Sequence, residues 1–366
     1  MIKKVIRVIG TIIHSISTYS PYTDRSVLYL LFDYLCLCRK KGYFYIDEYC
    51  NFRLDSQSEQ FRKNFLPHRL AHKYWDRVLN PVDYASLARD KFCSHLLLEK
   101  ADIATPHLFC YYNPDMGESI GIQANDYASV RALLLNQNVK AFVCKPSFYS
   151  SHGEGVFICK ELVFEDDDCI MVLRNKKLSL RKFLESANPC LFEALVVQTK
   201  QFYAFNPTSV NTIRMVTALY PDNTVKTVAA FVKIGRMGSD VDNAGSGGNV
   251  DAAIDINDGK ILNPIQFNSW MDIIGIKVHP DTNAQIDGII IDNWTKIVRS
   301  VESYQRRIPF IKMIGWDVAV TDNGPVIIEI NNYWDPTGQL FIGKGWLPDV
   351  ANCYDAWKDR VNLLKV

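Results

Sequence analysis

The chain has 366 residues, of which 48% are hydrophobic and 22% are charged. This composition is typical of a soluble globular protein with two or three domains. Lys and Arg number 41 against 40 Asp and Glu, so no basic field exists to attract nucleic acid, and we expect no nucleic-acid partner. The ten cysteines are scattered, without a Cys-x-x-Cys pair or zinc-ligand spacing. We therefore expect reduced, buried thiols and a cytoplasmic location.

The first twenty residues carry an apolar stripe at helical spacing, with basic residues beside it. Lys3, Lys4 and Arg7 lie off the stripe, whose members are Ile2, Val5, Ile6, Ile9, Ile12, Ile13 and Ile16. The apolar run is too interrupted for a signal peptide or a transmembrane helix. We favour packing of this helix on its own domain or on a partner subunit, as in a homodimer. Peripheral contact of residues 1–20 with an anionic membrane is the alternative.

Apolar periodicity and turn residues divide the rest of the chain into regions. Residues 1–85 are expected to be mainly helical, followed by a smaller region over 86–192 and a larger one over 193–366. Helices are predicted at 91–100, 127–136, 178–186 and 292–306. Strands are predicted at 107–112, 140–145, 155–159, 189–197, 213–219, 225–234 and 252–256. The mixture predicts an α+β fold with antiparallel sheets.

Residues 315–332 form two alternating runs around Asp322-Asn323-Gly324, which predicts a β-hairpin. A three-residue turn at 322–324 places Asp317 directly across from Glu329, with Asn331 diagonal to it. A two-residue Asn-Gly turn would place the two carboxylates on opposite faces. Facing carboxylates repel unless a cation lies between them, so the first register predicts a Mg²⁺ site that serves a nucleotide. An edge hairpin with one solvated face and no metal is an equally good interpretation of this stretch alone.

Two further segments place cations beside small-residue loops. Lys145 ends a predicted strand and precedes the loop 146–155, whose glycines and serines could turn backbone N–H groups toward a phosphate. Arg236 follows a strand that contains Lys233 and precedes the glycine-rich stretch 243–249. The alternatives are an ordinary hairpin loop in the first case and a flexible surface loop in the second.

Arg214 stands inside an apolar strand, between Ile213 and Met215. An unpaired buried charge is costly, so this guanidinium needs a partner. The partner is either an Asp or Glu of the protein or the carboxylate or phosphate of a substrate. We favour the substrate.

The order of these groups along the chain resembles the ATP-grasp superfamily. The series runs through Lys91, Lys145, Glu193, Arg214 and Arg236 and ends in Asp317 with Glu329-x-Asn331. More narrowly, residues 206–214 (Asn-Pro-Thr-Ser-Val-Asn-Thr-Ile-Arg) and 315–321 (Gly-Trp-Asp-Val-Ala-Val-Thr) resemble the sugar-transfer-associated ATP-grasp family, which is related to α-L-glutamate-ligase-like proteins. The resemblance covers about residues 80–350. It implies two α+β subdomains that enclose ATP.

The resemblance also implies a role for each group. The ATP-binding set would comprise Lys91, Lys145, Ser147, Ser150, Ser151, Gly153, Gly155, Lys233 and the hinge Glu193-Ala194-Leu195-Val196. Adenine would bind the Ala194 C=O and the Val196 N–H, and the loop 147–155 would close over the phosphates. Mg²⁺ would be held by Asp317, Glu329 and Asn331. Lys145, Arg214 and Arg236 would act on the transferred phosphoryl group or the substrate carboxylate.

One departure from the family pattern concerns the ribose. Many relatives place an acidic ribose contact a few residues after the hinge, where this chain has Gln198 and Lys200. The ribose contact is therefore open. The acceptor pocket is expected from residues 335–347 and the N-terminal region.

The implied activity is an ATP- and Mg²⁺-dependent carboxylate–amine ligase that works through an acyl phosphate. The family name associates it with surface-polysaccharide synthesis, so an amino acid and a sugar-linked carboxylate are the expected substrates. A phosphotransferase acting on a hydroxyl and a non-catalytic nucleotide-binding module are the alternatives.

Overall fold

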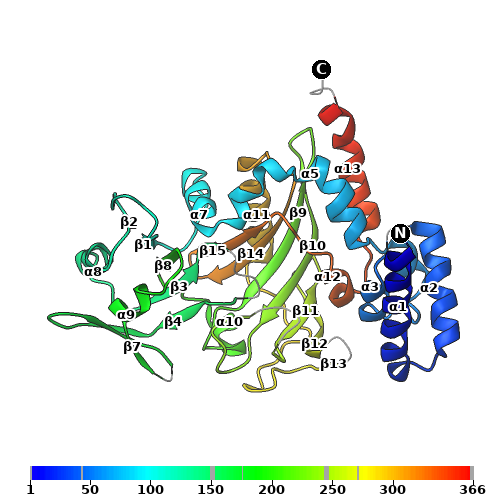
Figure 1. The fold of residues 1–366 in the computed structure, drawn as a ribbon, viewed down its shortest axis with the longest axis horizontal. Coiled ribbons are helices and arrows are strands. Elements are labelled where there is room, and N and C mark those ends of the chain that lie inside the picture. Colours follow the sequence, from blue (N-terminus) through cyan, green and yellow to red (C-terminus); the bar gives the residue numbers. More distant parts are fainter. Residues whose placement is uncertain are drawn as a thin grey trace.

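The computed structural model describes residues 2–42, 44–148, 153–174, 176–242, 247–269 and 272–362. Within these residues, helices surround sheets whose neighbouring strands run antiparallel in every pair except β1 and β2. The expected α+β class is confirmed. In Figure 1 a smaller sheet lies on the left, a larger sheet in the centre and the N-terminal helices on the right.

The N-terminal region is a group of helices with an apolar core of its own. Its helices are α1 (Ile2–Tyr19), α2 (Val27–Lys41), α3 (Ile46–Asn51) and α4 (Glu59–Asn64). Ile16 and Leu30 are fully buried between them, and Ile12 packs against the same cluster. The predicted stripe on α1 is therefore used only in part for packing, because Ile6, Ile9 and Ile13 of the same stripe are exposed.

Short helical segments lead from this region to the sheets. A π-helical turn over Arg69–Trp75 runs into α5 (Asp76–Leu79), and α6 (Ser86–Arg89) is followed by α7 (Lys91–Lys100). α5 ends at Leu79, and the next residue, Asn80, is buried. Its Nδ2 donates to the carbonyls of Met313 (2.8 Å) and Asn332 (2.7 Å), and its Oδ1 accepts from the N–H of Met313 (3.0 Å). This side chain ties the connection to the large sheet.

The smaller sheet has the strand order β2-β1-β8-β3-β4. Its strands are β1 (Leu108–Tyr112), β2 (Gln123–Ala124), β3 (Phe142–Pro146), β4 (Phe157–Cys159) and β8 (Cys190–Glu193). Helices α8 (Tyr127–Asn136) and α9 (Leu180–Leu184) accompany it, together with a small sheet of β5 (Glu161–Phe164), β6 (Cys169–Val172) and β7 (Lys177–Ser179). The sequence did not predict that small sheet, and β8 ends four residues before the predicted strand does.

The larger sheet has the order β13-β12-β11-β10-β9-β14-β15. Its strands are β9 (Thr212–Leu219), β10 (Val225–Ile234), β11 (Val250–Ile254), β12 (Ile261–Ser269), β13 (Asp272–Gly275), β14 (Met313–Thr321) and β15 (Gly324–Asn331). The helices α10 (Lys200–Phe205) and α11 (Trp294–Arg307) complete this part.

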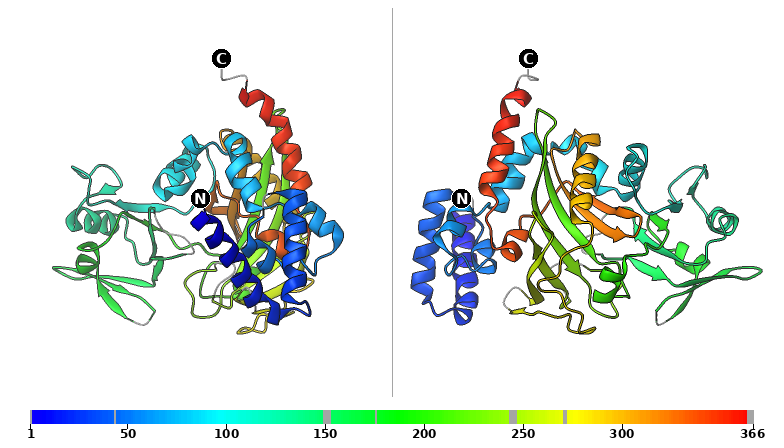
Figure 2. Two further views of the ribbon diagram at one scale, coloured as in Figure 1. Left: turned by 45° about the vertical axis from the view of Figure 1, so that its right-hand side comes forward. Right: turned by 180° about the vertical axis from the view of Figure 1, so that it is seen from behind.

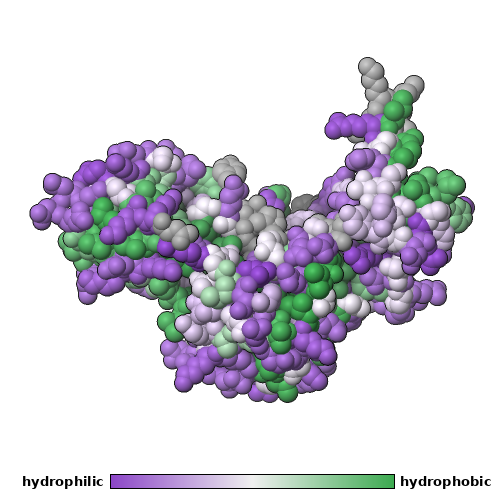
Figure 3. All heavy atoms as spheres, turned by 90° about the horizontal axis from the view of Figure 1, so that it is seen from below, coloured by the Kyte–Doolittle hydropathy of each residue, from purple (hydrophilic) through white to green (hydrophobic). Residues whose placement is uncertain are grey.

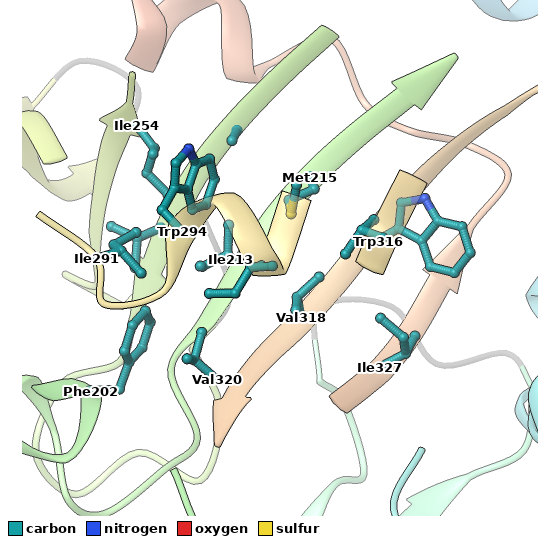
Figure 4. Close-up of a cluster of buried hydrophobic side chains, with 14 of the residues drawn as sticks. Phe202, Ile213, Met215, Ile254, Ile291, Trp294, Trp316, Val318, Val320 and Ile327 are labelled. Atoms are coloured by element: carbon teal, nitrogen blue, oxygen red, sulfur yellow. The ribbon is translucent and has the colours of Figure 1, made fainter. Parts of the chain in front are cut away.

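The two faces of the larger sheet differ because side chains alternate along each strand. One face is apolar and packs against α11, with Ile213, Met215, Trp316 and Val318 pointing into the shared core (Figure 4). Trp294, the first residue of α11, belongs to the same core. The residues between them in sequence therefore face the other way. This opposite face carries the polar groups described below.

The C-terminal helices close the other end of the molecule. α12 (Gly338–Ile342) and α13 (Leu347–Asn362) follow the hairpin, and α13 stands beside the N-terminal helices, far from the smaller sheet (Figure 2). Gln339 of α12 is fully buried. Its Oε1 accepts from the N–H groups of Leu66 (2.8 Å) and Trp346 (3.0 Å), while its Nε2 donates to the Leu66 carbonyl (3.0 Å). Gly345 lies so close to Asn64 that a Cβ would stand 2.3 Å from the Asn64 carbonyl atoms.

We expect Asn80→Ala to lower the free energy of unfolding by about 2–4 kcal/mol, because it leaves the buried N–H of Met313 and two carbonyls without a partner. Urea denaturation measures this loss. Asn136→Ala, at an exposed position near the end of α8, is the matched control and should change the free energy by less than about 0.5 kcal/mol. Equal effects of the two variants would contradict the assigned role of Asn80.

Candidate functional site

A cavity of about 1410 Å³ lies between the smaller sheet and the polar face of the larger sheet. Most of the residues singled out in the sequence line it: Lys91, Lys145, Gly153, Glu193, Ala194, Val196, Arg214, Lys233, Asp317, Glu329 and Asn331. Ser147, Gly155, Leu195 and Arg236 are not among the lining residues, and Ser150 and Ser151 lie outside the described part of the chain. Segments more than 200 residues apart thus meet in one cavity.

Lys145 and Glu193 form a buried ion pair on neighbouring strands of the smaller sheet. The Lys145 Nζ lies 2.6 Å from Glu193 Oε2, and both side chains are less than 15% exposed. The other oxygen of Glu193 lies 3.8 Å from His95 Nδ1. Burial lowers the pKa of His95, so this imidazole is neutral at pH 7. The carboxylate holds the Lys145 ammonium in place at the cavity wall.

The start of α7 places Lys91 at the cavity. Asp90 is the N-cap of this helix and accepts from the Cys93 N–H (2.9 Å) and from Ser147 Oγ (3.1 Å). The Lys91 N–H donates to the Ser147 carbonyl (2.8 Å). Ser147 is fully buried by these contacts, which explains why it does not line the cavity. The Lys91 ammonium then reaches Glu329 of β15 at 3.6 Å.

Arg214, Lys233 and Asp317 form a buried ionic cluster on the larger sheet. The Arg214 Nε and Nη2 donate to the two oxygens of Asp317 (2.6 and 3.1 Å), and the Lys233 Nζ lies 3.1 Å from Asp317 Oδ1. Burial opposes ionisation of Asp317, but the charges of Arg214 and Lys233 outweigh it and lower its pKa to about 2. The sequence favoured a substrate as the partner of Arg214, whereas in the structure its partner is Asp317.

Asp242 lies beside this cluster and was not singled out from the sequence. It accepts from the backbone N–H (2.7 Å) and the hydroxyl (2.5 Å) of Thr212, and it lies 3.9 Å from Lys233 Nζ. Burial raises the pKa of Asp242. Nothing in the sequence indicates that Asp242 is buried, because it is a single Asp in a polar loop. Its burial follows from its contacts with Thr212 at the start of β9.

The hairpin brings Asp317 and Glu329 directly opposite each other, as one of the two registers predicts. The turn that achieves this is not the expected three-residue turn. Thr321 pairs with Gly324, so the turn consists of Asp322 and Asn323. One extra residue, Ile328, forms a bulge between the Asp317–Glu329 and Val318–Ile327 pairs. The bulge shifts the register by one residue and so restores the facing carboxylates. Thr321 closes the turn by donating from Oγ1 to the Gly324 carbonyl (2.8 Å).

The hairpin offers the donor types that Mg²⁺ takes, with both oxygens of Asp317 already in contact with Arg214 or Lys233. Among the described residues no group of three or more His, Cys, Asp or Glu side chains could hold a metal, so a site here depends on two carboxylates and one amide. Asn331 donates from Nδ2 to the Gly315 carbonyl (3.3 Å), which leaves its amide oxygen for another contact. Mg²⁺ binds one or two carboxylates and takes its other ligands from water and substrate phosphates.

The segment after β8 is neither helix nor strand and borders the cavity through Ala194 and Val196. The Ala194 N–H donates to the His107 carbonyl (2.8 Å). Among the described residues, neither the Ala194 C=O nor the Val196 N–H takes part in a backbone hydrogen bond. These are the acceptor and the donor that the family resemblance assigns to adenine.

Gln198, at the position of the expected ribose contact, is buried and fully engaged. Its Nε2 donates to the carbonyls of Asn206 (2.9 Å) and Ser209 (3.0 Å), and its Oε1 accepts from Asn211. Lys200 is exposed at the start of α10. Gln198 therefore serves to hold the segment 206–211 in place.

Arg236 does not line the cavity. Its Nε and Nη2 donate to the carboxylate of Asp281 (2.7 and 2.6 Å), which lowers the pKa of Asp281 to about 2. The glycine-rich stretch beside it is described only from Gly247 onward. In the loop after β3, Gly155 has a φ of +76°, and a Cβ there would lie 2.7 Å from the Pro146 side chain. This glycine is required by close packing at the base of the loop.

A second polar cluster lies at the end of the cavity nearest the N-terminal region. His68 and Asp335 both line the cavity, and the His68 Nε2 lies 3.2 Å from Asp335 Oδ1. Its Nδ1 lies 3.0 Å from Glu48 Oε1. Burial opposes protonation of His68, yet the hydrogen bonds to Asp335 and Glu48 outweigh it and raise its pKa to about 9. The sequence pointed to residues 335–347 and the N-terminal region but not to this histidine.

Comparison with known proteins agrees with the fold. The sequence matches the family model described as sugar-transfer associated ATP-grasp over residues 69–354. Similar solved structures include D-alanine–D-alanine ligase from Bacillus anthracis, with 13% identity, a TM-score of 0.40, and coverage of 77% of this chain and 71% of that chain. None of the curated protein sequences matches.

Two further structures have comparable similarity. Biotin carboxylase from Campylobacter jejuni has 9% identity and a TM-score of 0.42, with 74% of this chain and 47% of that chain covered. N5-carboxyaminoimidazole ribonucleotide synthetase from Thermotoga maritima has 13% identity and a TM-score of 0.39, with 76% and 52% covered. The chain thus spans about half the length of these two enzymes.

The matched family model places this arrangement of sheets and cavity in the ATP-grasp class. Within that class, the chain belongs to the sugar-transfer associated ATP-grasp family.

The His68 cluster predicts a loss of stability at alkaline pH. A histidine whose pKa rises from 6.5 when unfolded to about 9 when folded stabilises the fold fully below pH 6.5, and this contribution disappears as the pH rises through 9. We expect the free energy of unfolding to fall by about 1–2 kcal/mol between pH 6.5 and 9, allowing for solvent screening. Urea denaturation at both pH values measures this difference in the free energy of unfolding.

His68→Gln should remove most of this pH dependence, whereas His14→Gln, at an exposed position on α1, should keep it. An unchanged slope in His68→Gln would show that other groups cause the loss.

Proposed function

We propose that the protein is an ATP- and Mg²⁺-dependent ligase that joins a carboxylate to an amine through an acyl phosphate. The observation that carries this proposal is the meeting of four cationic side chains and a facing carboxylate pair in one cavity between two sheets. Lys91, Lys145, Arg214 and Lys233 supply the positive charge. Asp317 and Glu329 supply the facing pair.

In this proposal ATP lies along the cavity with its adenine at the hinge. The Ala194 carbonyl accepts from the adenine amino group, and the Val196 N–H donates to a ring nitrogen. Lys91 and Lys145 approach the phosphates from the smaller sheet and α7, and Gly153 at the loop end lies beside them. These ammonium groups are already fixed by Glu329 and Glu193, so little side-chain entropy is lost when phosphates bind.

Asp317, Glu329 and Asn331 would hold Mg²⁺ beside the phosphates of ATP. When bound, the ion neutralises charge on the transferring group. Arg214 and Lys233 hold the Asp317 carboxylate in place and would extend the positive field toward the γ-phosphate. The substrate carboxylate attacks this phosphate, ADP leaves, and the amine displaces phosphate from the acyl phosphate. Enclosure between the sheets keeps water from the activated acyl group.

The acceptor substrates would bind at the end of the cavity near His68. Residues from 333–341 line the cavity together with His68, and they overlap the segment 335–347 from which the acceptor pocket was expected. The family description favours a sugar-linked carboxylate and an amino acid, in a cytoplasmic step of surface-polysaccharide synthesis.

Saturating Mg·ATP should raise the melting temperature of the protein by several degrees, since ligand at 100 times its Kd adds about 2.7 kcal/mol. Glu329→Gln should lose most of this gain while keeping its ligand-free melting temperature, because Glu329 is partly exposed. Glu161→Gln, exposed on β5, is the matched control and should respond like the wild type. Thermal shift assays with and without Mg²⁺ provide the measurement. No shift with any nucleotide would contradict the proposal.

ADP release should require a carboxylate and an amine together. We expect a screen of amino acids paired with uronic acids or nucleotide sugars to give ADP only for certain pairs. Arg214→Met should lower kcat/KM by at least about 100-fold. A stable phosphorylated hydroxyl product would instead identify a phosphotransferase. Binding of ATP with no ADP from any pair would indicate a non-catalytic module.

A further inference from the structure

The two N-terminal helices expose apolar stripes that their packing does not use. On α2, Leu28, Phe32 and Leu35 stand at i, i+4 and i+7 and are 79%, 69% and 53% exposed. On α1, Ile6, Ile9 and Ile13 are likewise exposed. Figure 3 shows apolar surface at the right-hand end of the molecule, where Figure 1 places these helices. We call these six residues the apolar platform.

The N-terminal helices do not use the apolar platform to pack their core. Both helices already bury another face in the N-terminal core, through Ile16 and Tyr19 on α1 and Leu30 and Tyr34 on α2. A helix at the surface of a globular protein normally carries charged and polar residues on its outward face. Contiguous exposed apolar side chains instead mark a surface that binds something.

Charge identifies what the platform binds. Residues 2–42 contain seven Lys or Arg against two Asp, whereas residues 43–366 contain 34 Lys or Arg against 38 Asp or Glu. One of the two acids, Asp33, is already paired with Arg62 at 2.6 Å. Arg7, Arg25, Arg39 and Lys40 are exposed. The chain is nearly neutral as a whole, so its positive charge is concentrated around the platform.

We propose that α1 and α2 dock the protein onto an anionic phospholipid surface. Apolar side chains would enter the boundary between headgroups and acyl chains, and the surrounding Lys and Arg would contact the headgroups. No helix in the described part of the chain is long and apolar enough to cross a membrane, so the helices lie on the surface. Tyr22 and Tyr29, both exposed, suit the interfacial zone where aromatic rings concentrate.

Charge also argues against the other occupants. A second copy of the chain would present the same basic surface, and like charges across an interface repel. Nucleic acid would pair with the basic side chains but would leave the six apolar side chains exposed to water. The inference is independent of the proposed reaction, because the platform shares no residue with the cavity lining.

Vesicle sedimentation tests the proposal with the full-length protein. We expect binding to vesicles of phosphatidylcholine with 30% phosphatidylglycerol, weak binding to pure phosphatidylcholine, and loss of binding at high salt. Leu28→Glu/Phe32→Glu and Arg39→Glu/Lys40→Glu should each reduce the partition coefficient at least about tenfold. Ile290→Glu, which changes a residue that is 56% exposed and distant in sequence, should leave it unchanged.

The variants also separate the alternatives. Light scattering should show the same oligomeric state for the wild type and both double variants. A wild-type dimer that Leu28→Glu/Phe32→Glu converts to a monomer, without vesicle binding, would overturn the proposal in favour of a subunit interface. Equal binding to neutral and anionic vesicles would overturn the electrostatic part. Because the mutated positions are exposed, retained melting temperatures should confirm that the variants are folded.

Discussion

The buried contact between Arg214 and Asp317 is the interaction on which the rest of the site depends. The two residues face each other in register on β9 and β14, and Lys233 on β10 completes the set. Placing such charges inside a protein is expensive, and removal of one partner leaves the others unpaired. The cluster therefore constrains the alignment of three strands as well as the direction of each side chain. It also lowers the pKa of Asp317 to about 2, which keeps this carboxylate ionised over the whole physiological pH range.

Sequence patterns predicted the composition of the site better than its geometry. Facing carboxylates were one of two registers that the hairpin allowed, and the structure has that register. The route differs, because a shorter turn and a bulge at Ile328 replace the three-residue turn. A bulge leaves no residue signature comparable to Asn-Gly, so alternation alone could not reveal it. The two-residue turn and the bulge together give the same Asp317–Glu329 pair as a three-residue turn would. The pairing was therefore predictable although the turn was not.

The residues that sequence reasoning misjudged are those whose partners are distant in the chain. Arg236 seemed available for a phosphate, yet Asp281, 45 positions later, takes up its guanidinium. Ser147 resembled a phosphate ligand, but its hydroxyl and backbone bind the start of α7 and its neighbours. His68 belongs to no motif, and only its contact with Asp335 in the structure draws attention to it. Local spacing identifies which residues can carry chemistry, whereas tertiary contacts decide which of them are free to do so.

The contacts of Gln339 and Gly345 with residues 64–66 have a consequence for the order of folding. The N-terminal helices leave the ribosome first, but the surface against which residues 64–66 pack is synthesised about 270 residues later. Until then, α1 and α2 have only their local core. At rates of about 5–20 residues per second, this interval lasts roughly 15–60 seconds. During it the backbone N–H of Leu66 lacks the Gln339 oxygen that it binds in the complete fold.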